Sequence, residues 1–325
     1  MHFWTMGVIV EIEIMTNHKI PWPEGKDFAF TVFDDTDRAI VNNVSAVYSF
    51  LSDCGFKTTK SVWPVRGNQN ATIDGSTCED SVYLRWLYEL EKLGFEIGYH
   101  NTTFHSSKRE DTIIGINKFK ELFGYSPKSH ANHLDCQESI YWGSYRLTGI
   151  NRFIYNVLTM KHHKGLFQGH IEESEYFWGD ICKENIKYVR NFVYDEINTL
   201  KACPIMPYHD KKRPYVNYWF ASSEGADLDA FVRCINEKNQ DSLEKEHGAC
   251  IMYTHFASGF YKDGKLDARF EGLMKRLSQK NGWFVPISTL LDYLMDKNGH
   301  HEITDQERNR LEKRWLLHKI RVGRT

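Results

Sequence analysis

The sequence predicts an α/β fold, a distorted (β/α) barrel of six to eight strand–helix units. Apolar segments of strand length alternate with segments of helical spacing, which is typical of parallel strands joined by helical crossovers. Several apolar segments end in acidic or imidazole side chains, as expected where parallel strands bring their carboxyl ends to one site. The number of units favours a closed barrel, with a doubly wound open sheet as the alternative.

The first two units are the clearest. An apolar strand is predicted over 28–33, and helical spacing of apolar residues follows from 40 to 51. A second strand is predicted over 58–65 and a second helix over 79–93. A glycine follows each helix directly or within a few residues, which is typical of a helix end.

The alternation continues beyond this point. A strand is predicted over 95–99, a helix over 111–123 and a short strand over 126–130. The alternation of strand-like and helix-like segments is less clear from about 143 to 225, where aromatic and turn residues are frequent. We interpret this stretch as an irregular insert that begins with a helix over 144–160 and contains at least one strand.

Regular units return in the last third of the chain. Helices are predicted over 228–236 and 265–280, with a strand over 249–254 between them. A last strand over 283–286 leads into a last helix over 287–295. No linker or low-complexity run divides residues 1–325, so we expect one domain, with a basic amphipathic helix at about 303–322.

Composition narrows the class of partner. The net charge of −2 gives no general attraction to nucleic acid or anionic membrane. The seven cysteines form no CxxC pair, which favours reduced thiols in a cytoplasmic protein. We also expect no signal peptide and no transmembrane segment, because Glu11 and Glu13 interrupt the apolar N-terminus.

Polar groups follow three of the predicted strands. Asp34 and Asp35 end the first strand, His100 follows the strand over 95–99 with His105 close behind, and His255 ends the strand over 249–254. Carboxylates and imidazoles gathered at strand ends favour a site for metal binding and acid/base chemistry. No glycine-rich phosphate loop and no GxSxG segment is present, so nothing supports nucleotide or serine-nucleophile chemistry.

These segments resemble the polysaccharide deacetylase family, which shares the NodB homology domain and includes carbohydrate esterases of family 4. The resemblance covers about residues 26–294. The segment 32–35, Val-Phe-Asp-Asp, matches the family's Thr-Phe-Asp-Asp motif, with a threonine one place early at Thr31. The segment 100–105 approximates the family's two-histidine motif with one residue too many, and the strand that ends at His255 resembles its last motif.

The resemblance implies a divalent metal held by Asp35, His100 and His105. Zinc is the first expectation, with cobalt, nickel or manganese as alternatives. It also implies that Asp34 is the general base and that His255 is the general acid toward the leaving amine.

The chain departs from the family pattern in two places. The extra residue before His105 would turn that imidazole about 100° around a regular helix. The segment is therefore expected to be a loop, or His133, His130 or Asp37 completes the ligand set. The family's Arg-Pro loop has no recognisable counterpart at 130–135. Candidate substrate or supporting residues are Asn132, His133, Trp142, Arg146 and Trp178.

The resemblance implies a metal-dependent hydrolase that removes an N-acetyl or related acyl group from a sugar or glycan intermediate. Two alternatives stay open. One is a carbohydrate-binding protein that keeps the barrel without turnover, and the other is a hydrolase of C–N bonds outside sugars. The sequence gives no indication of the oligomeric state.

Overall fold

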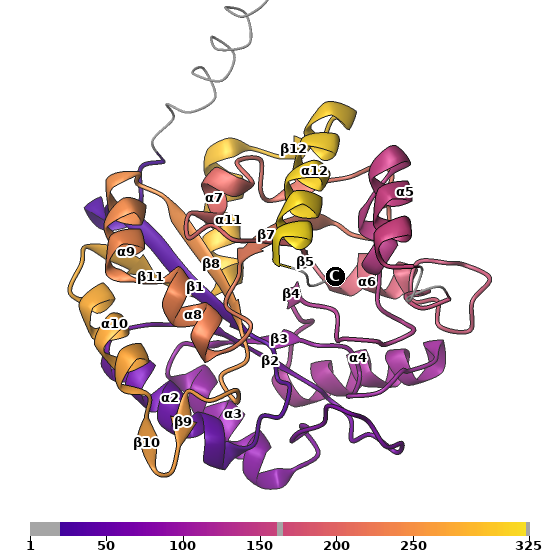
Figure 1. The fold of residues 1–325 in the computed structure, drawn as a ribbon. Coiled ribbons are helices and arrows are strands. Elements are labelled where there is room, and N and C mark those ends of the chain that lie inside the picture. The colour runs from indigo at the N-terminus through magenta and orange to yellow at the C-terminus, as the bar shows by residue number, and fades with distance from the viewer. Residues whose placement is uncertain (1–19, 161–164, 323–325) are drawn as a thin grey trace, which may run out of the picture.

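Seven parallel strands close into a barrel in the computed structural model, which describes residues 20–160 and 165–322. Each strand hydrogen-bonds to the next, and the last returns to the first (Figure 1). In ring order the strands are β1 (Phe28–Asp34), β2 (Thr59–Val62), β3 (Glu96–Tyr99), β4 (Ser129–His130), β5 (Tyr188–Tyr194), β7 (Tyr218–Ser223) and β8 (Ala249–Thr254). The predicted barrel is confirmed.

The strand register aligns the carboxyl ends of β1, β2, β3, β4 and β8. Asp34 lies opposite Lys60 of β2 and opposite Thr254 of β8. Tyr99 of β3 lies opposite both Val62 and His130. The residues that follow β1, β3, β4 and β8 therefore meet at one end of the barrel, which is where parallel folds place their chemistry.

Every residue of β1 is buried, because its two faces contact the barrel interior and the surrounding helices. The main helices around the barrel are α2 (Val41–Asp53), α3 (Ser81–Lys92), α4 (Arg109–Phe123), α8 (Leu228–Cys234), α9 (Glu237–Lys245), α10 (Ala268–Ser278) and α11 (Ile287–Asn298). One hydrophobic core extends from Trp22 to Leu316. This continuous core supports our proposal that the chain forms one domain.

Further strands extend the sheet beyond the ring. β11 (Gly282–Phe284) pairs with the start of β1. β6 (Tyr208–His209) pairs with β7 and with β12 (His301–Glu302). The short strands β9 (Tyr261–Lys262) and β10 (Lys265–Leu266) form a separate hairpin.

The helix predicted over 265–280 begins later than expected. Lys265 and Leu266 belong to the hairpin strand β10, and α10 starts at Ala268. The physical reason is the cap, because the Asp267 side chain accepts a hydrogen bond from the backbone N–H of Phe270 at 2.8 Å.

The stretch over 143–225 is more regular than predicted, because it contributes β5 and β7 to the barrel. Around them lie the 3₁₀ turn η2 (Gly143–Arg146) and the helices α5 (Gly149–Leu158), α6 (Gly179–Asn185) and α7 (Thr199–Ala202). The single helix predicted over 144–160 is thus divided into η2 and α5.

The C-terminal helix α12 (Asp305–Val322) packs against α5 and β5. No helix among the described residues is long and apolar enough to cross a bilayer. Our expectation about a signal peptide falls on residues 1–19, which lie outside the described ranges.

Candidate active site

Three potential metal ligands converge at the carboxyl end of the barrel. Asp37 follows β1, His100 follows β3 and His133 follows β4. Among the residues that the structure describes, these form the one group of three such side chains whose donor atoms lie within 4.8 Å of one another. Asp37 Oδ1 lies 3.1 Å from both His100 Nε2 and His133 Nδ1, and these two nitrogens are 3.2 Å apart.

The donor chemistry of this cluster fits a divalent cation. His100 Nδ1 lies 2.9 Å from the carbonyl oxygen of Ala131, so this nitrogen carries a proton, and Nε2 faces the cluster. Hydrogen bonds from His100, His133 and His255 hold the pKa of Asp37 well below its usual value, although burial alone would raise it. A carboxylate and two imidazoles are a donor set that catalytic metal sites use.

His255 borders the cluster from β8. Its Nε2 lies 3.3 Å from Asp37 Oδ2, and its Nδ1 lies 2.6 Å from the carbonyl oxygen of Ala226. Burial lowers the pKa of His255, but the contact with Asp37 and the charges of Asp37 and Asp35 outweigh it and raise the pKa to about 9. The imidazolium form is therefore favoured beside the carboxylates.

Asp35 forms a two-point ion pair with Arg190 of β5. Arg190 Nη1 lies 2.9 Å from Asp35 Oδ1, and Nη2 lies 2.6 Å from Oδ2. Both side chains are buried, and the guanidinium also lies over the ring of Tyr253. The Tyr253 hydroxyl is 3.5 Å from His255 Nε2, which links this pair to the cluster.

Asp34 has a different environment, because protein groups contact both of its carboxylate oxygens. Lys60 Nζ lies 2.8 Å from Oδ2, and the Tyr48 hydroxyl donates to the same oxygen at 2.9 Å. The backbone N–H of Phe256 donates to Oδ1 at 2.8 Å. The predicted base is thus held within a buried polar network.

The structure does not bring together Asp35, His100 and His105, the ligand set that the resemblance implies. The carboxylate of Asp35 is occupied by Arg190. His105 Nε2 accepts a hydrogen bond from the backbone N–H of Asn68 at 3.0 Å, and its Nδ1 lies 2.9 Å from the carbonyl oxygen of Ser106. His133, one of the alternatives from the sequence, lies where His105 was expected.

Two candidate substrate residues are engaged in local structure. Asn132 accepts from the backbone N–H of Ile140 at 2.8 Å and donates to its carbonyl oxygen at 3.1 Å, so it ties the loop after β4 together. Trp178 is fully buried, and its Nε1 donates to the carbonyl oxygen of Glu138 at 2.6 Å. Both residues therefore stabilise the segment that follows β4.

The other two candidates lie together. Arg146 is buried, and its guanidinium carbon lies 3.1 Å from the ring centroid of Trp142 and 5.2 Å from that of Trp315. Burial lowers the pKa of Arg146 to about 9, while Tyr155 and Tyr253 partly offset the effect. No carboxylate pairs with this arginine within the described part of the chain.

Arg190 is the residue that sequence reasoning missed. The signal was a single arginine at the centre of the segment 188–194, which otherwise reads as an apolar strand. A charged residue in the middle of a buried strand requires a buried partner, and here the partner is Asp35.

Comparisons with known proteins found similar solved structures at low sequence identity. No family model and no curated protein matches the chain. A Mycobacterium smegmatis protein described as a candidate polysaccharide deacetylase is similar, with a TM-score of 0.48 and 10% identity over 88% of this chain and 96% of that one. Polysaccharide deacetylases are thus among the solved structures that the chain resembles.

Two further solved structures are also similar to the chain. Puue allantoinase gives a TM-score of 0.47 and 11% identity over 86% of this chain and 94% of its own. The Bacillus subtilis peptidoglycan deacetylase PdaC gives a TM-score of 0.42 and 11% identity over 85% of this chain and 95% of its own.

Proposed function

We propose that this chain is a metal-dependent hydrolase of amide C–N bonds that removes an N-acetyl or related acyl group from a sugar or glycan intermediate. The observation that carries the proposal is the buried cluster of Asp37, His100 and His133 next to a paired carboxylate and an imidazole. The roles below replace the first assignment of Asp34, Asp35 and His105.

We assign the ligand roles to Asp37, His100 and His133, because their donor atoms lie within 4.8 Å of one another. A divalent metal held there, with zinc favoured by the two imidazoles, would polarise the substrate carbonyl and lower the pKa of a water molecule.

We assign the base role to Asp35. In this scheme Asp35 accepts a proton from the attacking water, and the water oxygen forms a bond to the carbonyl carbon. Arg190 fixes the orientation of this carboxylate through its two contacts. The two contacts hold both carboxylate oxygens in one position.

His255 completes the reaction as the general acid. The imidazolium donates its proton to the nitrogen as the C–N bond breaks, so the amine leaves neutral and the acyl group leaves as a carboxylic acid. The contact of Nδ1 with the carbonyl oxygen of Ala226 directs Nε2 toward the cluster.

We propose Trp142 and Arg146 as substrate contacts. An indole ring offers a stacking face for a sugar ring. A buried guanidinium with no carboxylate partner within 20–160 and 165–322 is a ready site for an acidic group of the substrate.

The test combines metal content with acyl release. The purified protein is loaded with zinc or cobalt, freed of excess, and measured by elemental analysis and by acetate release from a panel of N-acetylated sugars and non-sugar amides. His133→Ala is expected to lose stoichiometric metal and activity, whereas the matched control His105→Ala keeps both.

Two outcomes would overturn the proposal. If His133→Ala retains metal and His105→Ala loses it, the ligand set is the one first inferred from the resemblance. If the metal-loaded protein binds glycans but releases no acetate from any substrate, the chain is a binding protein.

A further inference from the structure

The helix α5 presents its apolar side to solvent. Ile150, Phe153, Val157 and Met160 just beyond the helix are 63%, 64%, 59% and 76% exposed. The side that faces the protein carries Asn151, Tyr155 and Thr159 instead, all of them buried. This is the reverse of the usual arrangement, in which an amphipathic helix buries its apolar stripe.

The concentration of exposed apolar side chains is specific to this place. Of the fourteen large hydrophobic residues exposed in the described chain, six lie between 150 and 160. Two more, Leu317 and Ile320, lie on the outer side of α12. A contiguous exposed apolar surface of this kind marks an interaction site, whereas single exposed residues need no explanation.

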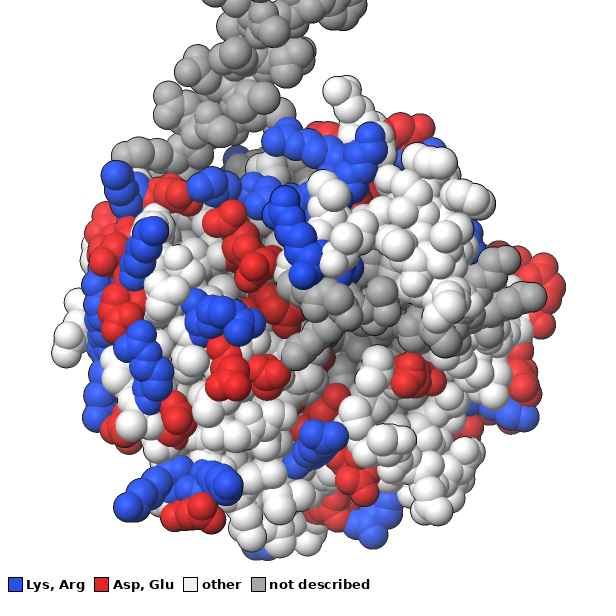
Figure 2. Space-filling model, in the orientation of Figure 1, with Lys and Arg blue, Asp and Glu red and all other residues white. Residues whose placement is uncertain are grey.

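A cationic surface adjoins this apolar face. Arg310, Lys313 and Arg321 of α12 are exposed, and no carboxylate among the described residues pairs with them. Figure 2 shows uncharged surface over α5 and a row of blue side chains over the neighbouring α12. The helix α5 itself contains no acidic residue.

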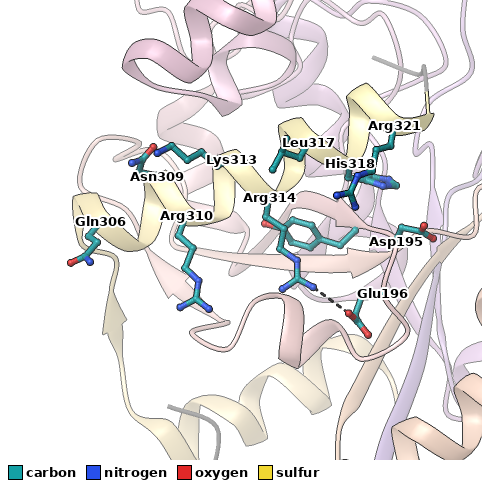
Figure 3. Close-up of a pocket in the computed structure, with 11 residues that line it drawn as sticks. Asp195, Glu196, Gln306, Asn309, Arg310, Lys313, Arg314, Leu317, His318 and Arg321 are labelled. Atoms are coloured by element: carbon teal, nitrogen blue, oxygen red, sulfur yellow. Dashed lines mark hydrogen bonds and ion pairs between the residues drawn. The ribbon is translucent and has the colours of Figure 1, made fainter. Parts of the chain in front are cut away.

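A pocket of about 700 Å³ opens beside α12 within the cationic surface (Figure 3). Four cationic side chains line it, namely Arg310, Lys313, Arg314 and Arg321, against two acidic ones, Asp195 and Glu196. Arg314 Nη2 lies 3.2 Å from Glu196 Oε2, so this acid is already neutralised. The pocket therefore favours an anion.

Hydrogen bonds hold α5 and the pocket-lining helix α12 next to each other. Asn309, which lines the pocket, accepts a hydrogen bond from Asn151 of α5 at 2.9 Å. The buried carboxylate of Glu312 accepts from the backbone N–H of Thr148, at the start of α5, at 2.9 Å. These contacts fix α12 against the inner side of α5.

We propose that α5 and α12 dock this protein onto an anionic phospholipid bilayer. The exposed face of α5 enters the boundary between headgroups and acyl chains, and the α12 cations contact the lipid phosphates. An apolar helix face flanked by lysine and arginine is the composition that binds such an interface. A second copy of the chain fits less well, because two such surfaces would bring their unpaired cations together.

The first test is co-sedimentation of the full chain with vesicles. We expect binding to vesicles of phosphatidylcholine mixed with an equal amount of phosphatidylglycerol, weaker binding to phosphatidylcholine alone, and loss of the difference at high salt. Lys313→Gln and Arg321→Gln should each weaken binding to the anionic vesicles about fivefold, since each cation near an anionic surface contributes about 1 kcal/mol.

The second test removes apolar surface. The double variant Phe153→Ser, Val157→Ser should reduce binding to both kinds of vesicle by about tenfold or more. Val82→Ser on α3 is the matched control, because Val82 is equally exposed and lies away from the patch, and it should bind like the unaltered protein.

Three results would overturn this proposal. One is that the protein binds neither kind of vesicle. Another is that the Val82→Ser control loses as much vesicle binding as the Phe153→Ser, Val157→Ser variant. The third is a concentration-dependent dimer in sedimentation equilibrium that Phe153→Ser, Val157→Ser abolishes, since the face would then be a protein interface. None of these results bears on the hydrolase, because acetate release from soluble substrates does not use this surface.

Discussion

Arg190 and Asp35 lie 155 residues apart in the sequence and form a two-point ion pair at the carboxyl end of the barrel. Both side chains are buried, so the pair is held in one geometry. This relationship sets Asp35 apart from the proposed metal ligands and orients its carboxylate.

Arg190→Lys tests the orienting role of the arginine. Lysine keeps the charge but cannot form the two parallel hydrogen bonds to the carboxylate oxygens, so turnover should fall by at least about tenfold. Metal content should stay unchanged, because Arg190 contacts no proposed ligand. The measurement is kcat with elemental analysis of the same sample, and loss of metal in this variant would contradict the assignment.

His255→Ala tests the general acid. Removing the proton donor should lower kcat by on the order of 10²-fold to 10⁴-fold and remove the alkaline limb of the pH profile. Substrates with a better leaving amine should lose less. If the variant instead loses its metal, His255 is a ligand.

Asp34→Asn should act on stability. Removing the charge of Asp34 leaves Lys60 buried without a partner, which costs about 3–5 kcal/mol of unfolding free energy. The double variant Asp34→Asn, Lys60→Met should recover part of this loss, and urea denaturation of the single and double variants measures it. If Asp34→Asn abolishes turnover at full stability, Asp34 is the base after all.

Glu138 should make stability depend on pH. Burial raises the pKa of this carboxyl to about 7 from its ordinary value of 4.5, although hydrogen bonds from Ser107 and Asn101 partly offset the effect. The folded state therefore holds a proton that the unfolded state releases, and stability falls as the pH rises from about 4.5 to about 7.

The matched variant is Glu138→Gln, which cannot ionise. Relative to this variant, the unaltered protein should lose roughly 2–3 kcal/mol between pH 4.5 and pH 7.5. Denaturant titrations of both proteins at several pH values measure the difference. A difference that does not change with pH would show that Glu138 is ionised throughout.

The sequence by itself determined the order of most strands and helices outside the stretch over 143–225. Buried parallel strands have a continuous apolar pattern that ends where the chain reaches solvent or the site, so β1, β3 and β8 could be placed from their residues alone. The same local pattern identified His100 and His255 as strand-end groups. β5 was harder to place, because Arg190 interrupts its apolar pattern.

Only the tertiary structure decided which side chains share a centre. Beyond the end of a strand the direction of a side chain depends on the turn of the loop, and here the chain turns after Asp37 with Arg38 at a φ of 60°. In the folded barrel Asp37 lies against His100, while Asp35 faces a strand more than a hundred residues away. Contacts between distant segments leave no local pattern in a single sequence, so His133 and Arg190 could take their places only in the folded barrel.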